Sequence, residues 1–218
     1  MRVHLSLLAL CAALLAAGPL AAKEKTKAPA APEPVACAGV FGPDSSEALV
    51  KDTFGANNVV TGTVYGAEGM EIIATTVFPD DPERKMQFGW FDEENLSRLS
   101  YVELAPNQIA PGGVRLGMSV ADVVKANGQD FIIGGFWWDY GGYANIEAGS
   151  LAGELEGGCS LSIRFSPEDG YPEDIDVTAV SGEVEVPTSE PLLEEIDTRV
   201  QVLSLGYPWP DDLPMPDY

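Results

Sequence analysis

The hexapeptide MQFGWF, residues 86–91, places apolar side chains at alternate positions, Met86, Phe88 and Trp90. Residues 160–165, SLSIRF, alternate in the same way. Because successive side chains of a β-strand point to opposite faces, each hexapeptide predicts a strand with one buried and one solvated face. Such strands are typical of an antiparallel sheet that is covered by helices on one side.

Two short segments carry the signals that begin and end a helix. One opens with Asp44 followed by Glu47, and the other opens with Ser119 followed by Asp122. A capping side chain with an acid three residues later satisfies the free backbone N–H groups of a first helical turn. Each segment continues with apolar residues and a Lys, and ends in Gly, which accepts the left-handed conformation that stops a helix. Both segments therefore predict short helices.

Runs of strand-forming residues follow each predicted helix. They lie at residues 58–65, 71–78, 85–91 and 100–104, then at 131–133, 159–165 and 174–180, and finally at 198–205. Lys51 and Lys125 in the helices are separated by nearly the same number of positions as Trp90 and Phe165 in the strands.

A helix followed by antiparallel strands, used twice, explains this spacing, with repeat halves at approximately 44–105 and 117–186. Coincidence between two generic helix starts is the alternative. We expect an α+β fold in which two helix-plus-antiparallel-sheet repeats form one mostly β domain, with short helices on one face.

The chain begins with Arg2, an apolar run and a small-residue exit, which together predict a cleavable signal peptide over residues 1–22. The apolar run is shorter than the roughly 20 residues of a membrane span, so we expect no membrane insertion after leader cleavage; an uncleaved anchor is the alternative. Residues 23–35, rich in Lys, Ala and Pro, predict a flexible spacer. Residues 36–206 then form a single domain, and the Pro-rich residues 207–218 form an extended or loose tail.

The chain is strongly acidic, with 34 Asp and Glu against 12 Lys and Arg and a formal net charge of −22. A negative field repels nucleic acid and anionic lipid and attracts cationic partners; acidity that only maintains solubility is the alternative. Acidic runs at residues 92–94 and 168–176 lack the EF-hand spacing of calcium ligands. We therefore expect solvated hairpin tips there and no metal site.

Two cysteines, Cys37 and Cys159, remain once Cys11 leaves with the leader. An even number in an exported protein predicts a disulfide, with two separate buried thiols as the alternative. The one histidine, His4, also lies in the leader, which removes Ser-His and Cys-His catalysis and His-ligated zinc. We expect a periplasmic or secreted protein that is not an enzyme and takes no cofactor.

Two motifs resemble those of other proteins. Residues 113–119, GVRLGMS, stand at the start of the second predicted helix, and with the inferred repeat they are similar in plan to β-lactamase inhibitory proteins and their relatives. Residues 135–142, GFWWDYGG, resemble a G-F-x-W-D-Y-G-G motif of uncharacterised secreted bacterial proteins. The first resemblance implies a tandem helix-plus-sheet fold, and neither implies a function or an interface residue.

The stretch 136–143, FWWDYGGY, holds five aromatic residues within eight positions. A strand cannot bury all of them on one side, so some are expected to be exposed, and exposed aromatic side chains mark recognition surfaces. The alternative is a core role for some and packing under a loop for the others. The candidate binding residues are Phe136, Trp137, Trp138, Asp139, Tyr140 and Tyr143.

The leading hypothesis is a non-catalytic binding module that recognises a protein partner, with a cationic partner favoured, through these aromatic residues and the acidic surface. The second is a carbohydrate-binding or carbohydrate-active protein that uses the same aromatic residues. The third is a structural envelope domain without a discrete ligand.

Overall fold

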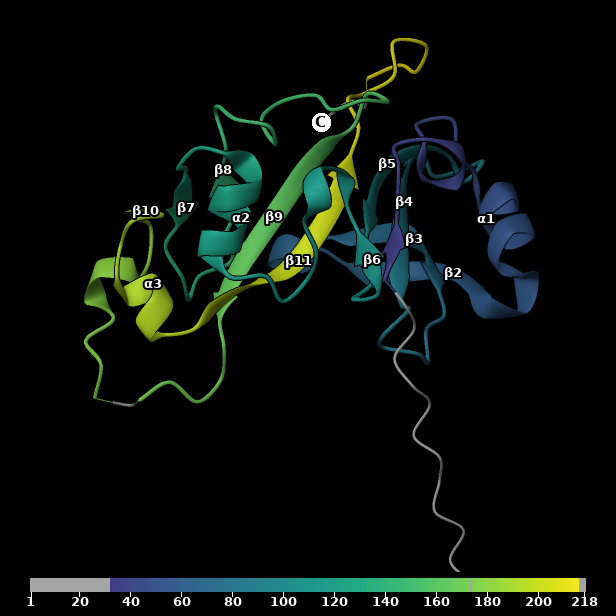
Figure 1. Ribbon diagram of the computed structural model, residues 1–218. Coiled ribbons are helices and arrows are strands. Elements are labelled where there is room, and N and C mark those ends of the chain that lie inside the picture. The colour runs from purple at the N-terminus through teal and green to yellow at the C-terminus, as the bar shows by residue number, and fades with distance from the viewer. Residues whose placement is uncertain (1–31, 173, 216–218) are drawn as a thin grey trace, which may run out of the picture.

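The computed structural model describes residues 32–172 and 174–215 (Figure 1). The fold is α+β and consists mostly of strands, as the sequence predicts. The signal peptide predicted at 1–22 and the spacer as far as residue 31 lie outside the described residues. None of the described helices is long and apolar enough to cross a membrane.

A six-stranded sheet forms the centre of the molecule, in the order β2-β3-β4-β5-β11-β9, with all neighbours antiparallel. Its strands are β2 (Val59–Tyr65), β3 (Glu71–Val77), β4 (Met86–Asp92), β5 (Ser97–Glu103), β9 (Ser160–Pro167) and β11 (Thr198–Gly206). Figure 1 shows β2 to β5 on one side and the remaining strands of the second half of the chain on the other, with the long β9 and β11 between the two groups.

A smaller sheet has the order β10-β7-β8. Its strands are β7 (Ile132–Gly134), β8 (Ala144–Asn145) and β10 (Glu185–Pro187). It adjoins the free edge of β9 through an isolated bridge between Tyr143 and Arg164. The segment 135–143 connects β7 to β8 and therefore lies next to the large sheet.

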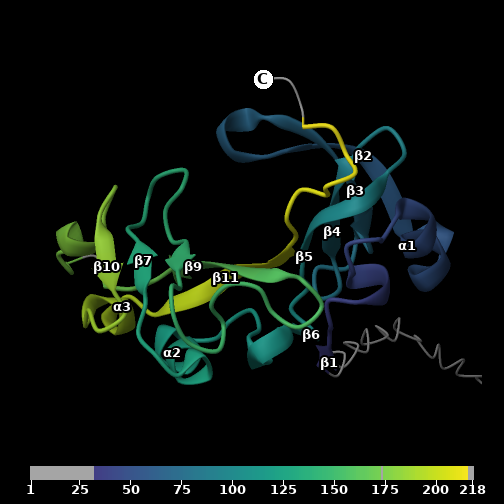
Figure 2. The same ribbon diagram turned by 90° about the horizontal axis from the view of Figure 1, so that it is seen from above.

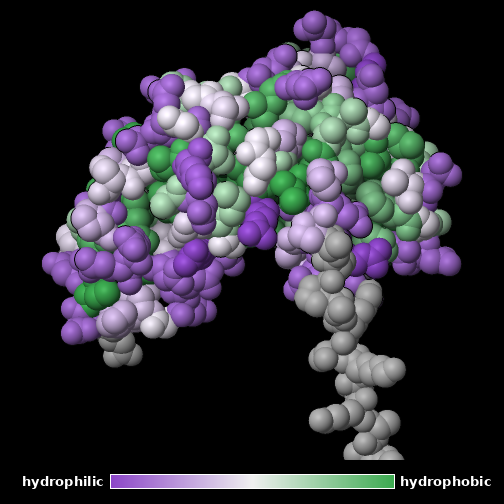
Figure 3. Space-filling view, in the orientation of Figure 1, coloured by the Kyte–Doolittle hydropathy of each residue, from purple (hydrophilic) through white to green (hydrophobic). Residues whose placement is uncertain are grey.

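The helices are α1 (Glu47–Phe54), α2 (Val120–Asn127) and α3 (Leu192–Glu195). Figure 2 shows α1 and α2 along the same side of the curved sheet, while the β2–β3 hairpin and the connection from β7 to β8 project from the opposite side. On the face seen in Figure 3, apolar residues gather over the middle and hydrophilic residues at the outer ends.

The helix termini follow the sequence with one correction. Ser119 caps α2 as predicted, because its Oγ accepts a hydrogen bond from the Asp122 N–H at 3.1 Å. For α1 the predicted cap, Asp44, is wrong: Ser46 accepts from the Leu49 N–H at 3.3 Å. The carboxylate of Asp44 instead accepts a hydrogen bond from Arg98 at 2.8 Å.

The core fills the space between the sheet and its helices. Met86, Phe88 and Trp90 are all buried, as their alternation predicts. Ile163 and Phe165 of β9 belong to the same cluster, so both halves of the chain share one core.

The predicted disulfide between Cys37 and Cys159 is confirmed. It joins positions separated by 122 in the sequence, and their Cα atoms lie 5.9 Å apart. Both residues are buried, so the bond ties the N-terminal segment of the domain to the beginning of β9 from within the core.

Two segments differ from the sequence predictions. Glu33–Pro34, at the end of the predicted spacer, forms β1 and pairs in parallel with β6 (Gln108–Ile109). The strand predicted at 174–180 is wrong, since Thr178–Val180 forms a short 3-10 turn. The carboxylate of Asp176 accepts a hydrogen bond from the Thr178 N–H at 3.0 Å, a local bond that favours a turn over a strand.

The Pro-rich C-terminal segment is held to the rest of the molecule, and it turns back at residues 210–213, where the Leu213 N–H donates to the Pro210 carbonyl at 3.2 Å. The ring of Trp209 contacts Phe91 edge-on with centroids 4.9 Å apart, and Asp212 pairs with Arg98. The hydroxyl of Tyr207 donates to the Phe41 carbonyl, and burial raises the pKa of this phenol to about 12.

Candidate functional site

One face of the large sheet is not covered by α1 or α2, and we call it the open face. It carries the side chains that alternate with the buried ones. One row of cross-strand partners crosses all six strands: Val60, Thr76, Gln87, Glu103, Ser204 and Ser162. Val202 and Arg164 form the next such pair, and Tyr143 lies beside Arg164.

The middle of the open face is polar and negatively charged. The Gln87 side-chain amide donates to the Tyr101 hydroxyl at 2.8 Å. Loss of hydration raises the pKa of Tyr101, and the charges of Glu103 and Glu93 raise it further. Loss of hydration also raises the pKa of the neighbouring Glu103, with Lys85 acting in the opposite direction.

The segment 135–143 is a tight loop held by its own backbone. The Gly142 N–H donates to the Gly134 carbonyl at 2.9 Å, and the Gly142 carbonyl accepts from the Phe165 N–H of β9 at 2.7 Å. Gly142 has φ of 82°, and a Cβ there would lie 2.0 Å from the Phe165 carbonyl oxygen. The indole N–H of Trp138 donates to the Gly135 carbonyl at 2.8 Å. Gly142, in the second half of the GFWWDYGG motif, thus allows the loop to approach β9 closely.

The loop separates the candidate binding residues into two groups. Phe136 is buried, with 3% of its surface exposed, and Trp138 is partly buried. Trp137, Tyr140 and Tyr143 expose 53%, 47% and 42% of their surfaces, and Asp139 is exposed as well. The structure therefore brings all six residues into one loop and presents four of them to solvent.

A pocket of about 280 Å³ opens between this loop, the end of β9 and the middle of β11. It is lined by Phe136, Trp137, Gly141, Arg164, Phe165, Ser166, Pro167, Gln201 and Val202. The pairing of β11 with β9 is irregular between Val200 and Val202, so Gln201 lies in a β-bulge. Bulges redirect a side chain, and here the redirected residue lines the pocket.

Arg164 fixes the rim of this pocket. Its Nε donates to the Gly141 carbonyl at 2.8 Å and its Nη2 to the Asp139 carbonyl at 3.2 Å. The guanidinium also lies 5.2 Å from the centroid of the Tyr143 ring, within the range of a cation–π contact. Nothing in the sequence singles out Arg164, Ser166 and Gln201, because alternation marks them merely as solvated strand positions.

The β2–β3 hairpin reaches the same loop from the far end of the sheet. The carboxylate of Glu68 forms a hydrogen bond with the Tyr140 side chain, and this bond and the charge of Glu68 raise the pKa of Tyr140. Tyr65 and Met70 flank the hairpin tip and are 73% and 63% exposed. Nothing in the sequence of the hairpin signals this contact between segments distant in the chain.

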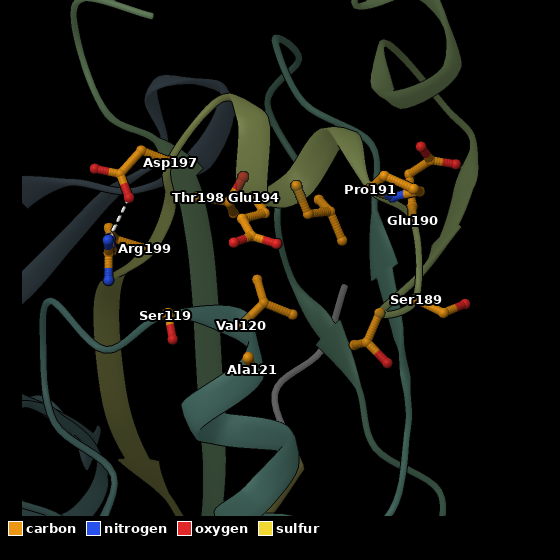
Figure 4. Close-up of a pocket in the computed structure, with 12 residues that line it drawn as sticks. Ser119, Val120, Ala121, Ser189, Glu190, Pro191, Glu194, Asp197, Thr198 and Arg199 are labelled. Carbon is orange, nitrogen blue, oxygen red and sulfur yellow. Dashed lines mark hydrogen bonds and ion pairs between the residues drawn. The ribbon is translucent and has the colours of Figure 1, made fainter.

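A larger pocket of about 520 Å³ lies between the N-terminus of α2 and α3 (Figure 4). Several of its polar groups are already bonded: Asp197 pairs with Arg199, Ser119 with Asp122, and Glu190 accepts from the Leu192 N–H. The buried hydroxyl of Thr198 has no hydrogen-bond partner among the described residues. The pocket holds no exposed aromatic side chain. We therefore place the candidate site at the aromatic loop.

Within residues 32–172 and 174–215, no three His, Cys, Asp or Glu side chains are grouped so that they could hold a metal ion. No family model, no curated protein and no solved structure matches the chain.

Proposed function

We propose that this protein is a non-catalytic periplasmic or secreted binding module that recognises a protein partner through its aromatic loop and acidic surface. One observation carries the proposal: Trp137, Tyr140 and Tyr143 are exposed together on a loop that backbone hydrogen bonds hold against β9. Large aromatic side chains on a rigid support bury much area at little entropic cost when a partner binds.

The charge of the molecule supports a cationic partner. The chain has a formal net charge of −22, and Glu68 and Asp139 lie beside the exposed rings. Complementary charge raises the rate of encounter and fixes orientation more than it raises affinity. Binding is therefore expected to weaken as the salt concentration rises.

An oxidising compartment is supported by two independent features. The predicted signal peptide would export the chain, and the disulfide between Cys37 and Cys159 is the kind of bond that persists outside the cytoplasm.

We also propose that the two halves are structural repeats. The strand order β2-β3-β4-β5 in the first half has a counterpart in the second, where β7 and β8 of the smaller sheet adjoin β9 through the isolated bridge between Tyr143 and Arg164, and β9 pairs with β11. β5 and β11 meet antiparallel in the middle. A helix precedes each set of strands, α1 before β2 and α2 before β7. An approximate twofold axis between β5 and β11 would relate the halves, which supports the tandem plan expected from the sequence.

A retention experiment tests the binding proposal. The purified protein is immobilised, incubated with envelope and secreted extracts, and compared with the variant Trp137→Ala/Tyr140→Ala. The matched control is Leu49→Ala/Val60→Ala, which truncates two exposed apolar side chains outside the loop. A protein retained by the wild type and the control, and lost from the loop variant, supports the proposal. Equal retention by all three, or no retained protein, contradicts it.

A further inference from the structure

We propose that the pocket beside Trp137 receives one tyrosine-like side chain of the partner, an aromatic ring with a polar group at its far end. This inference rests on the proposed function and specifies the chemistry that the partner brings to the same site. It assigns a ligand to a pocket whose lining residues come from three separate parts of the chain.

The size of the pocket fits a single side chain. Its volume is about 280 Å³, below the roughly 300–1,000 Å³ of pockets that take drug-sized ligands. An oligosaccharide or a folded element would therefore contact its mouth, whereas one large side chain would fill it.

The walls favour an aromatic ring. Trp137, Phe136 and Val202 line the pocket. Phe136 is buried, so the accessible aromatic surface is that of Trp137, whose ring stands edge-on to Phe136 with centroids 5.8 Å apart. On its other side Trp137 lies 6.4 Å from the ring of Tyr171. An incoming ring would extend this series of aromatic contacts, which prefer edge-on or offset arrangements at such distances.

The polar groups of the pocket favour a neutral hydroxyl and disfavour a cation. Gln201 supplies an amide, which donates and accepts hydrogen bonds. Ser166 supplies a hydroxyl that can accept a hydrogen bond, since it donates its own hydrogen to the Pro167 carbonyl at 3.2 Å. Arg164 also lines the pocket, and its positive charge repels a Lys or Arg side chain. Cationic groups of the partner would instead face Glu68 and Asp139 outside the pocket.

Two backbone irregularities build the pocket in advance. Trp137 has φ of 62°, a conformation that L-residues rarely adopt, and it turns outward from a loop whose next-door residue Phe136 is buried. Gln201 reaches the pocket from the β-bulge of β11. Strained residues and bulges that converge on one cavity are typical of functional sites, because regular strands would be more stable there.

Titration of the intact protein with small probes tests the inference. The probe is N-acetyl-tyrosinamide, followed by ¹H–¹⁵N spectra in which the indole N–H of Trp137 reports binding. A dissociation constant of about 1–10 mM is expected for a ligand of this size. N-acetyl-lysinamide, N-acetyl-leucinamide and methyl glucoside serve as comparison probes and are expected to bind at least about tenfold more weakly.

Three variants locate the binding. Trp137→Ala, in which the backbone N–H of Gly141 in the pocket lining replaces the lost indole as reporter, is expected to abolish saturable binding of N-acetyl-tyrosinamide. Val60→Ala, which truncates an exposed residue at the far end of the open face, is expected to leave binding unchanged. Gln201→Ala is expected to weaken N-acetyl-tyrosinamide about threefold to tenfold but to leave N-acetyl-phenylalaninamide unchanged, which tests the polar end without disturbing Trp137.

Other outcomes overturn the inference. Tighter binding of methyl glucoside would mark a sugar site, tighter binding of N-acetyl-lysinamide would mark a cation site, and no saturable binding would leave the pocket without this ligand. These results are separable from failure of the proposed function. A retained partner together with no binding of N-acetyl-tyrosinamide overturns the pocket assignment alone, whereas probe binding without any retained partner overturns the protein-binding proposal alone.

Discussion

The ring of Tyr101 lies directly over the backbone of Gly89, its cross-strand partner on the open face. A Cβ on Gly89 would stand 2.0 Å from Cε1 of Tyr101 and 2.5 Å from Cδ1. The tyrosine thus covers the space that a missing side chain leaves in the middle of the sheet, and its hydroxyl is held by Gln87.

Gly89→Ala is expected to destabilise the protein by about 1–3 kcal/mol, because the added methyl group must displace the ring. In a Tyr101→Ala background the same change is expected to cost less than about 0.5 kcal/mol, which a double-mutant cycle by denaturant unfolding measures. Gly62→Ala is the matched control, since a Cβ at Gly62 meets no atom within 4 Å. Equal effects of Gly89→Ala in both backgrounds would contradict the contact.

Glu103 is expected to weaken the fold when it ionises. Loss of hydration raises its pKa above the unfolded value, so the folded state holds the proton more tightly than the unfolded state. The stability that Glu103 contributes is therefore present below the unfolded pKa and is lost as the pH rises through the folded pKa. Glu103→Gln should raise the unfolding midpoint at pH 7 and leave it nearly unchanged at pH 3.

Glu94→Gln controls for the general effect of removing a negative charge from an acidic protein, because Glu94 lies in the turn between β4 and β5 and not in a strand of the open face. The gain at pH 7 is expected to be larger for Glu103→Gln than for Glu94→Gln. Equal gains would show that the environment of Glu103 has no local effect.

The cap of α2 is expected to contribute measurably to stability. Ser119 accepts from the Asp122 N–H and donates to the Asp122 carboxylate at 2.8 Å. Ser119→Ala should lower the free energy of unfolding by about 1 kcal/mol. Ser189→Ala changes an exposed serine in the same region and should stay within about 0.5 kcal/mol of wild type. A cap change no larger than this control would count against the capping role.

The disulfide between Cys37 and Cys159 is expected to contribute strongly to the stability of the folded state. Cys37→Ala/Cys159→Ala should lower the free energy of unfolding by roughly 4–5 kcal/mol, since the bond closes a loop of 122 positions. Denaturant unfolding of the wild type with and without reductant gives an independent value. A loss below about 1 kcal/mol in both experiments would contradict this role.

Much of the fold follows from local patterns. Alternation at residues 86–91 identified β4 and its buried face, and the Ser119–Asp122 pair identified the start of α2. These features depend on neighbours in the chain, so the sequence displays them directly. From its local sequence Asp44 is as suitable a helix cap as Ser119. Its carboxylate instead accepts a hydrogen bond from Arg98, which is distant in the sequence.

The candidate site was less predictable. The aromatic composition of 136–143 indicates the loop that carries the candidate site, yet alternation alone does not show that Trp137 is exposed while Phe136 is buried. That difference depends on the positive φ of Trp137 and on contacts with β9. The pocket beside Trp137 also needs Gln201, which lies in a bulge of β11. The register between β9 and β11 cannot be predicted from the sequence of either strand.

The adjacency of β5 and β11 imposes an order on how the chain matures. β5 is synthesised early, whereas its sheet neighbour β11 begins only at Thr198. The backbone N–H and C=O groups along this edge of β5 therefore stay unpaired until the second half of the chain has been synthesised. A polypeptide cut short before Thr198 would keep this edge open as a template for a foreign strand. Truncated products are therefore expected to self-associate, and pairing of β11 with β5 removes this open edge.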